Sequence, residues 1–253
     1  MSQFIIKTPE QIKGIKKSAQ LASQTLDYIT PYVKEGINTQ KLNDLVHQFI
    51  VDHHAQPAPL NYRGFPKSIC TSINSVVCHG ISSEKDILKK GDILNIDVTT
   101  ILNGYYGDTS RMFLIEPVTK KARLLVQRTK NALDKSIAAL KPGRFLNECV
   151  GKTIEKYIEP FGYSSVRTLT GHGVGLKFHE KPSVFHFDTG QNNIKLKPGM
   201  IFTIEPMINA SLNYRVKTDP KDGWTIYTVD GALSAQWEHT ILITATKGEI
   251  LSK

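Results

Sequence analysis

The sequence has few cysteines and no long apolar segment, and these shortages exclude several classes of protein. Cys70, Cys78 and Cys149 are an odd number without CxxC spacing, which favours neither a disulfide framework nor a cysteine-based zinc site. No apolar run approaches the roughly 18 residues that a membrane helix needs. Charged residues interrupt positions 7–17, so the apolar region of a secretory signal is also missing. We therefore expect a globular cytoplasmic protein that does not associate with a membrane.

Negative charge is also in short supply. The chain carries 32 Lys+Arg against 23 Asp+Glu, a net charge of +9, and such a field favours contact with polyanions such as RNA. Simple solubility explains the charge about equally well, because the basic residues are scattered. Lys120, Lys121 and Arg123 come nearest to a cluster, and no RNA-binding motif accompanies them. We expect transient ribosome contact, no DNA binding and a monomer.

Helical and strand patterns alternate in pairs along the chain. Thr8, Pro9 and Gln11 form a capping signal for a helix that should run to about Ile29. A second amphipathic pattern starts at Thr39. Two further helices are expected over about 120–140 and 147–158, and β-rich runs occupy 93–100, 110–115, 200–204 and 240–244. The order is thus helix pair, strands, helix pair, strands.

This order reflects an internal duplication. Residues 88–97 align with 196–205 (196 − 88 = 108), sharing Leu, Lys, Gly and two Ile and ending in a carboxylate each time. The link Lys34-Glu35-Gly36 recurs as Lys141-Pro142-Gly143 at an offset of 141 − 34 = 107. We therefore expect one domain over 1–253 with related halves of about 8–115 and 116–246. The fold class should be α/β (α+β), with a pseudo-two-fold antiparallel sheet covered by two helix pairs.

The first half brings two aspartates together. Asn103-Gly104 is a strong signal for a two-residue hairpin. With that turn, Asp97 faces position 110 and Asp108 faces position 99, so both carboxylates lie on one sheet face as diagonal neighbours, roughly 7–8 Å apart. Two such anions repel unless a proton or a cation lies between them. The alternative is that both are simply solvated on an exposed face.

The second half supplies Glu205, Glu238 and His172. Both glutamates lie in otherwise apolar, strand-like runs, and His172 lies among glycines that let the backbone approach a neighbour closely. Taken alone, His172 could be an ordinary loop histidine. Four carboxylates and one imidazole together suit two divalent cations in an oxygen-rich site. Two such ions can activate a water and polarise a carbonyl, so the residues indicate a dinuclear hydrolase.

Seven segments carry a specific resemblance. They are His79-Gly80, Asn95-Ile-Asp97, Gly107-Asp-Thr109, Gly171-His-Gly-Val-Gly175, Phe178-His-Glu180, Thr203-Ile-Glu-Pro206 and Gln236-Trp-Glu-His239. In order, and over nearly the whole chain, these segments resemble the type I methionine aminopeptidases. The resemblance implies the pita-bread fold, itself an internal duplication. It also implies two divalent metal ions (Co, Mn, Fe or Zn), with the ligands Asp97, Asp108, His172, Glu205 and Glu238.

The resemblance also implies a reaction. A metal-bridging hydroxide would attack the first peptide bond of nascent polypeptides and release methionine, with a small second residue preferred. Asp108 and Glu238 would bridge both ions, Asp97 would hold one, and His172 with Glu205 would hold the other. Glu205 would also carry a proton to the leaving amine. His79 and His179 would contact the substrate and stabilise the tetrahedral intermediate.

The same resemblance implies a substrate pocket and a third ion site. The pocket walls for the methionine side chain would be Tyr62, Phe65, Cys70, Phe178 and Trp224, a soft aromatic slot that suits a thioether. A monovalent cation (Na or K) would lie at Asn74, Val76 and Ser234. Three departures, Pro59, Phe65 and Leu176-Lys177, touch the pocket rim or its support and leave the ligand positions intact.

Two alternatives to this activity remain. An X-Pro peptidase of the same fold generally carries an extra N-terminal domain, and only 78 residues precede His79. Cleavage of Met-Ala-Ser against Ala-Pro-Ala distinguishes the two. A non-enzymatic module that binds ribosomal RNA would typically have lost metal ligands, whereas all five positions carry them here. Ribosome binding without peptidase activity would favour the module.

Overall fold

The computed structural model describes residues 4–253, and its helices follow the predicted pattern closely. The helices are α1 (Pro9–Ile29), α2 (Thr39–Asp52), α3 (Lys120–Ala139), α4 (Leu146–Cys149) and α5 (Gly151–Ile158), with 3-10 turns η1 (Thr30–Tyr32), η2 (Tyr62–Gly64) and η3 (Glu159–Phe161). The Thr8 side chain accepts from the Gln11 backbone and the Gln11 side chain caps Thr8 in return, which confirms the expected capping box. Within residues 4–253, no helix is both long and apolar enough to cross a bilayer.

The fourth predicted helix was expected as one piece and is in fact divided. The backbone of Val150 (φ −102°, ψ −76°) interrupts it between α4 and α5. A Cβ added to Gly151 would lie 2.1 Å from the Phe187 carbonyl oxygen. The chain therefore passes the 187 region at backbone contact, and only glycine fits at that point.

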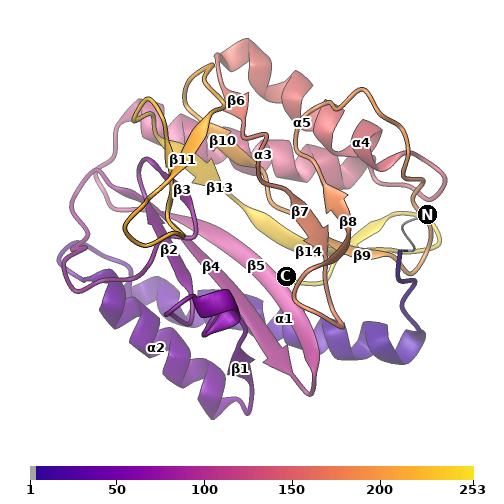
Figure 1. The fold of residues 1–253 in the computed structure, drawn as a ribbon, viewed down its shortest axis with the longest axis horizontal. Coiled ribbons are helices and arrows are strands. Elements are labelled where there is room, and N and C mark those ends of the chain that lie inside the picture. The colour runs from indigo at the N-terminus through magenta and orange to yellow at the C-terminus, as the bar shows by residue number, and fades with distance from the viewer. Residues whose placement is uncertain (1–3) are drawn as a thin grey trace.

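The strands form one large curled sheet and two small ones (Figure 1). The nine-stranded sheet has the order β1-β4-β5-β14-β9-β7-β8, with β2 on β4 and β15 on β14, and its pairings are antiparallel. Its strands are β1 (Gln56–Pro57), β2 (Cys70–Ile73), β4 (Ile93–Leu102), β5 (Tyr105–Leu114), β7 (Gly171–Gly173), β8 (Glu180–Val184), β9 (Ile201–Ile204), β14 (Glu238–Ile243) and β15 (Gly248–Ile250). The small sheets join β13 (Ser234–Gln236), β10 (Met207–Asn209) and β6 (Ser164–Ser165), and β11 (Val216–Thr218), β12 (Ile226–Thr228) and β3 (Val76–Cys78).

Each helix group packs on its own part of the large sheet. Alternate residues of β4, including Leu94 and Ile96, are fully buried against α1 and α2. Phe202 and Ile204 of β9 are likewise buried against α3, α4 and α5. Figure 1 shows the two helix groups along different sides of the strands, so helices cover the sheet as predicted. Burial of this apolar surface, at roughly 25 cal/mol per Å², supplies the main stabilisation.

The two copies of the repeated motif form the same hydrogen bonds. The backbone N–H of Gly36 donates to the Leu88 carbonyl at 2.9 Å, and Leu88 N–H donates to Ile37 at 2.9 Å. Gly143 and Leu196 repeat both bonds at 2.9 Å, with Arg144 in place of Ile37. Gly36 and Gly143 also share a left-handed backbone, with φ of 86° and 85°. The alignment found in the sequence therefore corresponds to equivalent geometry.

The hairpin that joins β4 to β5 has the predicted register. Asn103 and Gly104 form the turn with φ of 52° and 80°, the double left-handed conformation of a type I′ turn. Asp97 pairs with Ser110, and Asp108 pairs with Thr99. Both aspartates therefore lie on the sheet face opposite Leu94 and Ile96, away from α1 and α2.

Candidate active site

One cavity of about 470 Å³ opens on this face of the sheet. Its deep residues include Asp108 and Glu238, which are 3% and 1% exposed. Its rim carries the exposed residues Arg63, Thr168, His179 and Ser183. The remaining lining residues are Pro59, Tyr62, Phe65, Cys70, Cys78, His79, Asp97, Thr99, Leu169, Thr170, His172, Phe178, Glu180, Glu205, Met207 and Trp224. Every predicted ligand, substrate-contacting histidine and pocket wall thus lines the same cavity.

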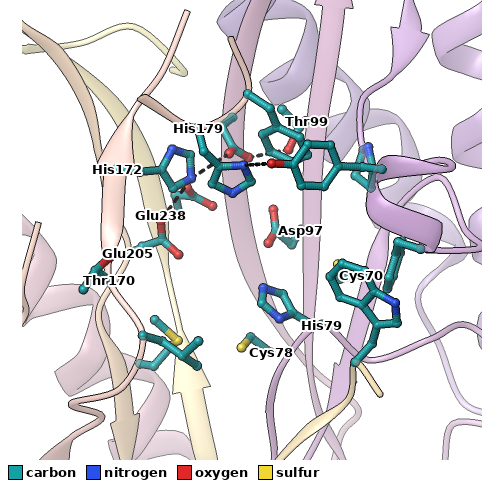
Figure 2. A pocket seen from close by; sticks show the side chains of 18 of the residues that line it. Cys70, Cys78, His79, Asp97, Thr99, Thr170, His172, His179, Glu205 and Glu238 are labelled. Carbon is teal, nitrogen blue, oxygen red and sulfur yellow. Dashed lines mark hydrogen bonds and ion pairs between the residues drawn. The ribbon is translucent and has the colours of Figure 1, made fainter. Parts of the chain in front are cut away.

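The predicted metal ligands come from five separate parts of the fold. Asp97 is on β4, Asp108 on β5, His172 on β7 and Glu238 on β14, and Glu205 directly follows β9. Figure 2 shows the side chains of Asp97, His172, Glu205 and Glu238 pointing into one space. Ligand atoms of Asp108, His172 and Glu238 all lie within 4.8 Å of one another. The His172 Nε2 atom is 3.6 Å from Asp108 Oδ2 and 3.7 Å from Glu205 Oε1.

His172 presents a lone pair to these carboxylates. Its Nδ1 lies 3.0 Å from the Gly173 carbonyl, so this nitrogen carries the proton and Nε2 is free to bind a cation. Burial lowers the pKa of His172 to about 4. The ring is therefore neutral at pH 7 and does not by itself neutralise the carboxylates beside it.

The four carboxyl groups among the predicted metal ligands have raised pKa values. Burial, followed by the neighbouring carboxylates, raises the pKa values of Asp97, Glu205 and Glu238 well above their ordinary values. Burial also raises the pKa of Asp108 to about 7, although a hydrogen bond from Thr99 opposes the shift. Four carboxyls lining one cavity, of which Asp108 and Glu238 are buried and Asp97 and Glu205 partly buried, cannot all ionise unless cations accompany them. The oxygen-rich donor set, with one neutral imidazole, fits divalent metal ions.

Three polar side chains donate to two of these carboxylates, a fourth accepts from the backbone of Glu205, and the sequence did not identify any of the four as a site residue. The Thr99 hydroxyl donates to Asp108 Oδ1 at 2.7 Å. Both oxygens of Glu205 accept, one from the Thr203 hydroxyl at 2.7 Å and the other from the Gln236 amide at 3.2 Å, while its backbone N–H donates to His186 at 3.0 Å. Thr99 and Thr203 share a sheet face with the carboxylates they bind, so strand alternation could have found them. No local signal points to His186.

The two histidines expected to contact substrate lie on opposite walls (Figure 2). His79 has a left-handed backbone, with φ of 56°, and burial lowers its pKa. The His179 ring lies 4.2 Å from the His172 ring, and its Nδ1 is 3.0 Å from the Tyr62 hydroxyl. Desolvation at the cavity wall, reinforced by His172, His79 and Arg63, lowers the pKa of His179 to about 3. Both rings are therefore neutral at pH 7.

Aromatic side chains form the apolar walls. Phe65 meets Trp224 edge to face with ring centres 5.3 Å apart, and Tyr62 packs against Phe178 at 4.8 Å. Cys70 is buried among them, and Cys78, which the sequence analysis did not assign, also lines the cavity. Burial raises the pKa of both thiols well above the usual range, so both act as small apolar wall groups.

The residues expected to hold a monovalent cation lie outside the cavity. The Asn74 carbonyl accepts from the Ser234 backbone at 2.9 Å, so these two are adjacent. Val76 begins β3 and pairs with Tyr227. The structure thus brings Asn74 and Ser234 together, while ion binding there remains a prediction.

Comparison with known proteins agrees with this geometry. Residues 13–245 match the model of metallopeptidase family M24. The chain is 51% identical to a methionine aminopeptidase of Rickettsia prowazekii, over 98% of this chain and 94% of that one. A crystal structure of methionine aminopeptidase from the same organism superposes with a TM-score of 0.95 at 50% identity, covering 99% of this chain and all of the other.

A more distantly related solved structure has the same fold. A prolidase from Pyrococcus furiosus superposes with a TM-score of 0.74 at 26% identity, and the match covers 98% of this chain but 65% of the prolidase. Together with the curled antiparallel sheet, these similarities confirm the pita-bread fold expected from the sequence. The chain belongs to metallopeptidase family M24 and, within it, to the methionine aminopeptidases.

Proposed function

We propose that the chain removes the N-terminal methionine from nascent polypeptides and prefers a small second residue. The main support is the convergence of one histidine and four carboxylates around a cavity that also has a soft apolar wall. Membership of the methionine aminopeptidases supports the activity, and the close ligand atoms of Asp108, His172 and Glu238 support dependence on a divalent metal.

Asp97, Asp108, His172, Glu205 and Glu238 would hold two divalent ions. When bound, such ions supply Lewis acidity toward a carbonyl and lower the pKa of water. Cobalt, manganese, iron and zinc all suit this donor set, and cellular availability decides among them. A sodium or potassium ion at Asn74, Val76 and Ser234 completes the proposed ion sites.

Glu205 is the proposed proton carrier. Burial and Asp108 raise the pKa of its carboxyl, so it can accept a proton from the attacking water and later donate it to the leaving amine. Thr203 and Gln236 each bind one of its oxygens, which holds the group in one orientation. The proposed proton transfer thus depends on the Glu205 carboxyl, which Thr203 and Gln236 hold in position.

His79 and His179 are the proposed partners of the scissile peptide. In the tautomer in which Tyr62 donates to Nδ1 of His179, Nε2 carries the proton and can donate to a carbonyl oxygen. A neutral ring can fill this role because the N–H that it retains donates a hydrogen bond to the oxygen on which negative charge develops. The methionine side chain would occupy the slot formed by Tyr62, Phe65, Cys70, Phe178 and Trp224.

An assay on short peptides tests the proposal. Purified protein with added Mn²⁺ or Co²⁺ should cleave Met-Ala-Ser, spare Ala-Pro-Ala, cleave Met-Leu-Ser much more slowly and lose activity on chelation. Glu205→Gln should abolish turnover while the circular dichroism spectrum stays unchanged. Near-normal turnover by this variant would contradict the role of Glu205, and cleavage of Ala-Pro-Ala instead would favour an X-Pro peptidase.

The proposal also includes the cellular compartment, contact with the ribosome and the oligomeric state. Three buried free cysteines suit the reducing cytoplasm, and the net charge of +9 favours transient contact with ribosomal RNA as substrates emerge. We propose a monomer. Sedimentation of the purified protein, alone and with ribosomes at low and high salt, tests both statements.

A further inference from the structure

A single permanent cation lies at the rim of the cavity. Among the described residues that line it, only Arg63 carries a guanidinium or an ammonium group. The other charged lining residues are Glu180, which pairs with Lys7, and the four carboxylates of the proposed metal site. Arg63 is exposed and, within residues 4–253, its side chain makes no ion pair with an acidic group. Its hydrogen-bond donors are available to a ligand.

An unusual backbone presents this side chain. Asn61, Arg63 and Gly64 all have left-handed backbones, with φ of 64°, 50° and 88°. Such a conformation costs roughly 1 kcal/mol or more for arginine, which has a Cβ. Backbone hydrogen bonds close the turn, from Asn61 to Phe65 at 2.8 Å and from Tyr62 to Pro59 at 2.9 Å. The turn therefore holds Tyr62 and Arg63 at the mouth in a defined position.

The guanidinium belongs to the same cluster as the substrate-facing residues. Its carbon lies 5.4 Å from the centre of the Tyr62 ring, and the Tyr62 hydroxyl contacts His179. Arg63 thus lies beside a residue proposed to contact the scissile peptide.

A polypeptide substrate would leave the cavity through the rim that Arg63 lines. Its first peptide bond would lie at the deep carboxylates, and the rest of the chain leaves through the open rim. An extended chain advances about 3.3–3.6 Å per residue, so the third and fourth residues reach the rim soon after the bond to be cleaved. We propose that Arg63 is a specificity-determining residue that favours substrates with an acidic side chain at the third or fourth position. This inference rests on the proposed function.

The expected preference is modest because the pair would be exposed to solvent. Exposed ion pairs, such as Arg63 with an acidic substrate side chain, change a binding equilibrium by about twofold to fivefold. A lysine in the substrate replaces this attraction by repulsion, which increases the difference between the two peptides. We expect kcat/KM for Met-Ala-Glu-Ser to exceed that for Met-Ala-Lys-Ser by about threefold to tenfold at low salt. Arg63→Gln should bring the ratio close to one, and Arg63→Glu should invert it.

Lys67→Gln is the matched control. It removes the same charge four residues away, from a side chain that hydrogen-bonds Gln40 and does not line the cavity. This variant should keep the acidic preference of the unmodified enzyme. Equal loss of the preference in both glutamine variants would assign the effect to net charge and overturn the role of Arg63.

Two further measurements keep the test decisive. The ratio in the unmodified enzyme should shrink toward one in about 0.5 M NaCl, because salt screens exposed charges. A ratio of one at low salt, or a ratio that salt does not change, overturns the inference without any variant. The neutral peptide Met-Ala-Ser-Ser reports on the proposed function separately: its cleavage with no charge preference refutes Arg63 alone, whereas failure to cleave any peptide refutes both.

Discussion

A buried ion pair joins Lys7, just before α1, to the loop that carries Phe178 and His179, two of the proposed site residues. The side chains of Lys7 and Glu180 contact each other and are 1% and 2% exposed. Glu180 also accepts from the backbone N–H groups of Leu176 and Lys177, at 2.7 and 2.9 Å. Phe178 and His179 lie between Lys177 and Glu180 in this loop. We predict that Lys7→Met destabilises the fold and displaces this loop.

The burial of the pair determines the size of the effect. Removing one partner leaves the Glu180 carboxylate buried without its countercharge, which typically costs about 3–5 kcal/mol. For a chain of this length the corresponding drop in Tm is about 6–20 °C. The double variant Lys7→Met/Glu180→Gln should recover much of the loss, because no unpaired charge remains and the glutamine carbonyl can still accept from the two backbone N–H groups.

Thermal unfolding of the single and double variants measures the coupling between the two residues. Peptide assays at a temperature where every variant is folded should show a lower kcat for Lys7→Met, since His179 would be less well placed. Lys16→Met serves as a control, because its partner Glu249 is 38% exposed and the Lys16 side chain 44%. A Lys7→Met variant as stable and as active as the unmodified protein would refute the reasoning.

Three further predictions concern the sheet, the rim and the metal. Gly107→Ala should destabilise the protein by about 1–3 kcal/mol in urea unfolding, because its Cβ would lie 2.1 Å from the Ala19 backbone nitrogen of α1; an unchanged midpoint would contradict this close approach. Tyr62→Phe should lower kcat by about twofold to tenfold through loss of the bond to His179, and an unaltered kcat would show that this bond does not position the ring. The pKa of Asp108 is raised from 3.8 to about 7, so its contribution to the stability of the metal-free protein is complete below about pH 4 and is lost as the pH rises through about 7. Added Mn²⁺ should therefore raise the Tm more at pH 8 than at pH 6, and equal shifts would count against a protonated carboxyl in the metal-free site.

Local chemistry in the sequence determined the elements and part of the site. The Thr8 capping box, the Asn103-Gly104 turn and the duplicated motif depend on near neighbours, and the structure forms all three. Strand alternation then places Asp97 and Asp108 on one face without any knowledge of the rest of the fold. The division between α4 and α5 escaped prediction, and the close approach of Gly151 to Phe187 beside it joins positions 36 residues apart (187 − 151 = 36), which no local pattern reports.

Only the tertiary structure decided how the halves meet. The closeness of His172 to Asp108, the support of Glu205 by His186 and the exposure of Arg63 at the rim all depend on side chains from distant segments. Periodicity reports which face of an element is buried, but it does not report which element covers that face. The residue types of the site could therefore be read along the chain, whereas their distances and protonation states depend on the curled sheet that excludes water from them.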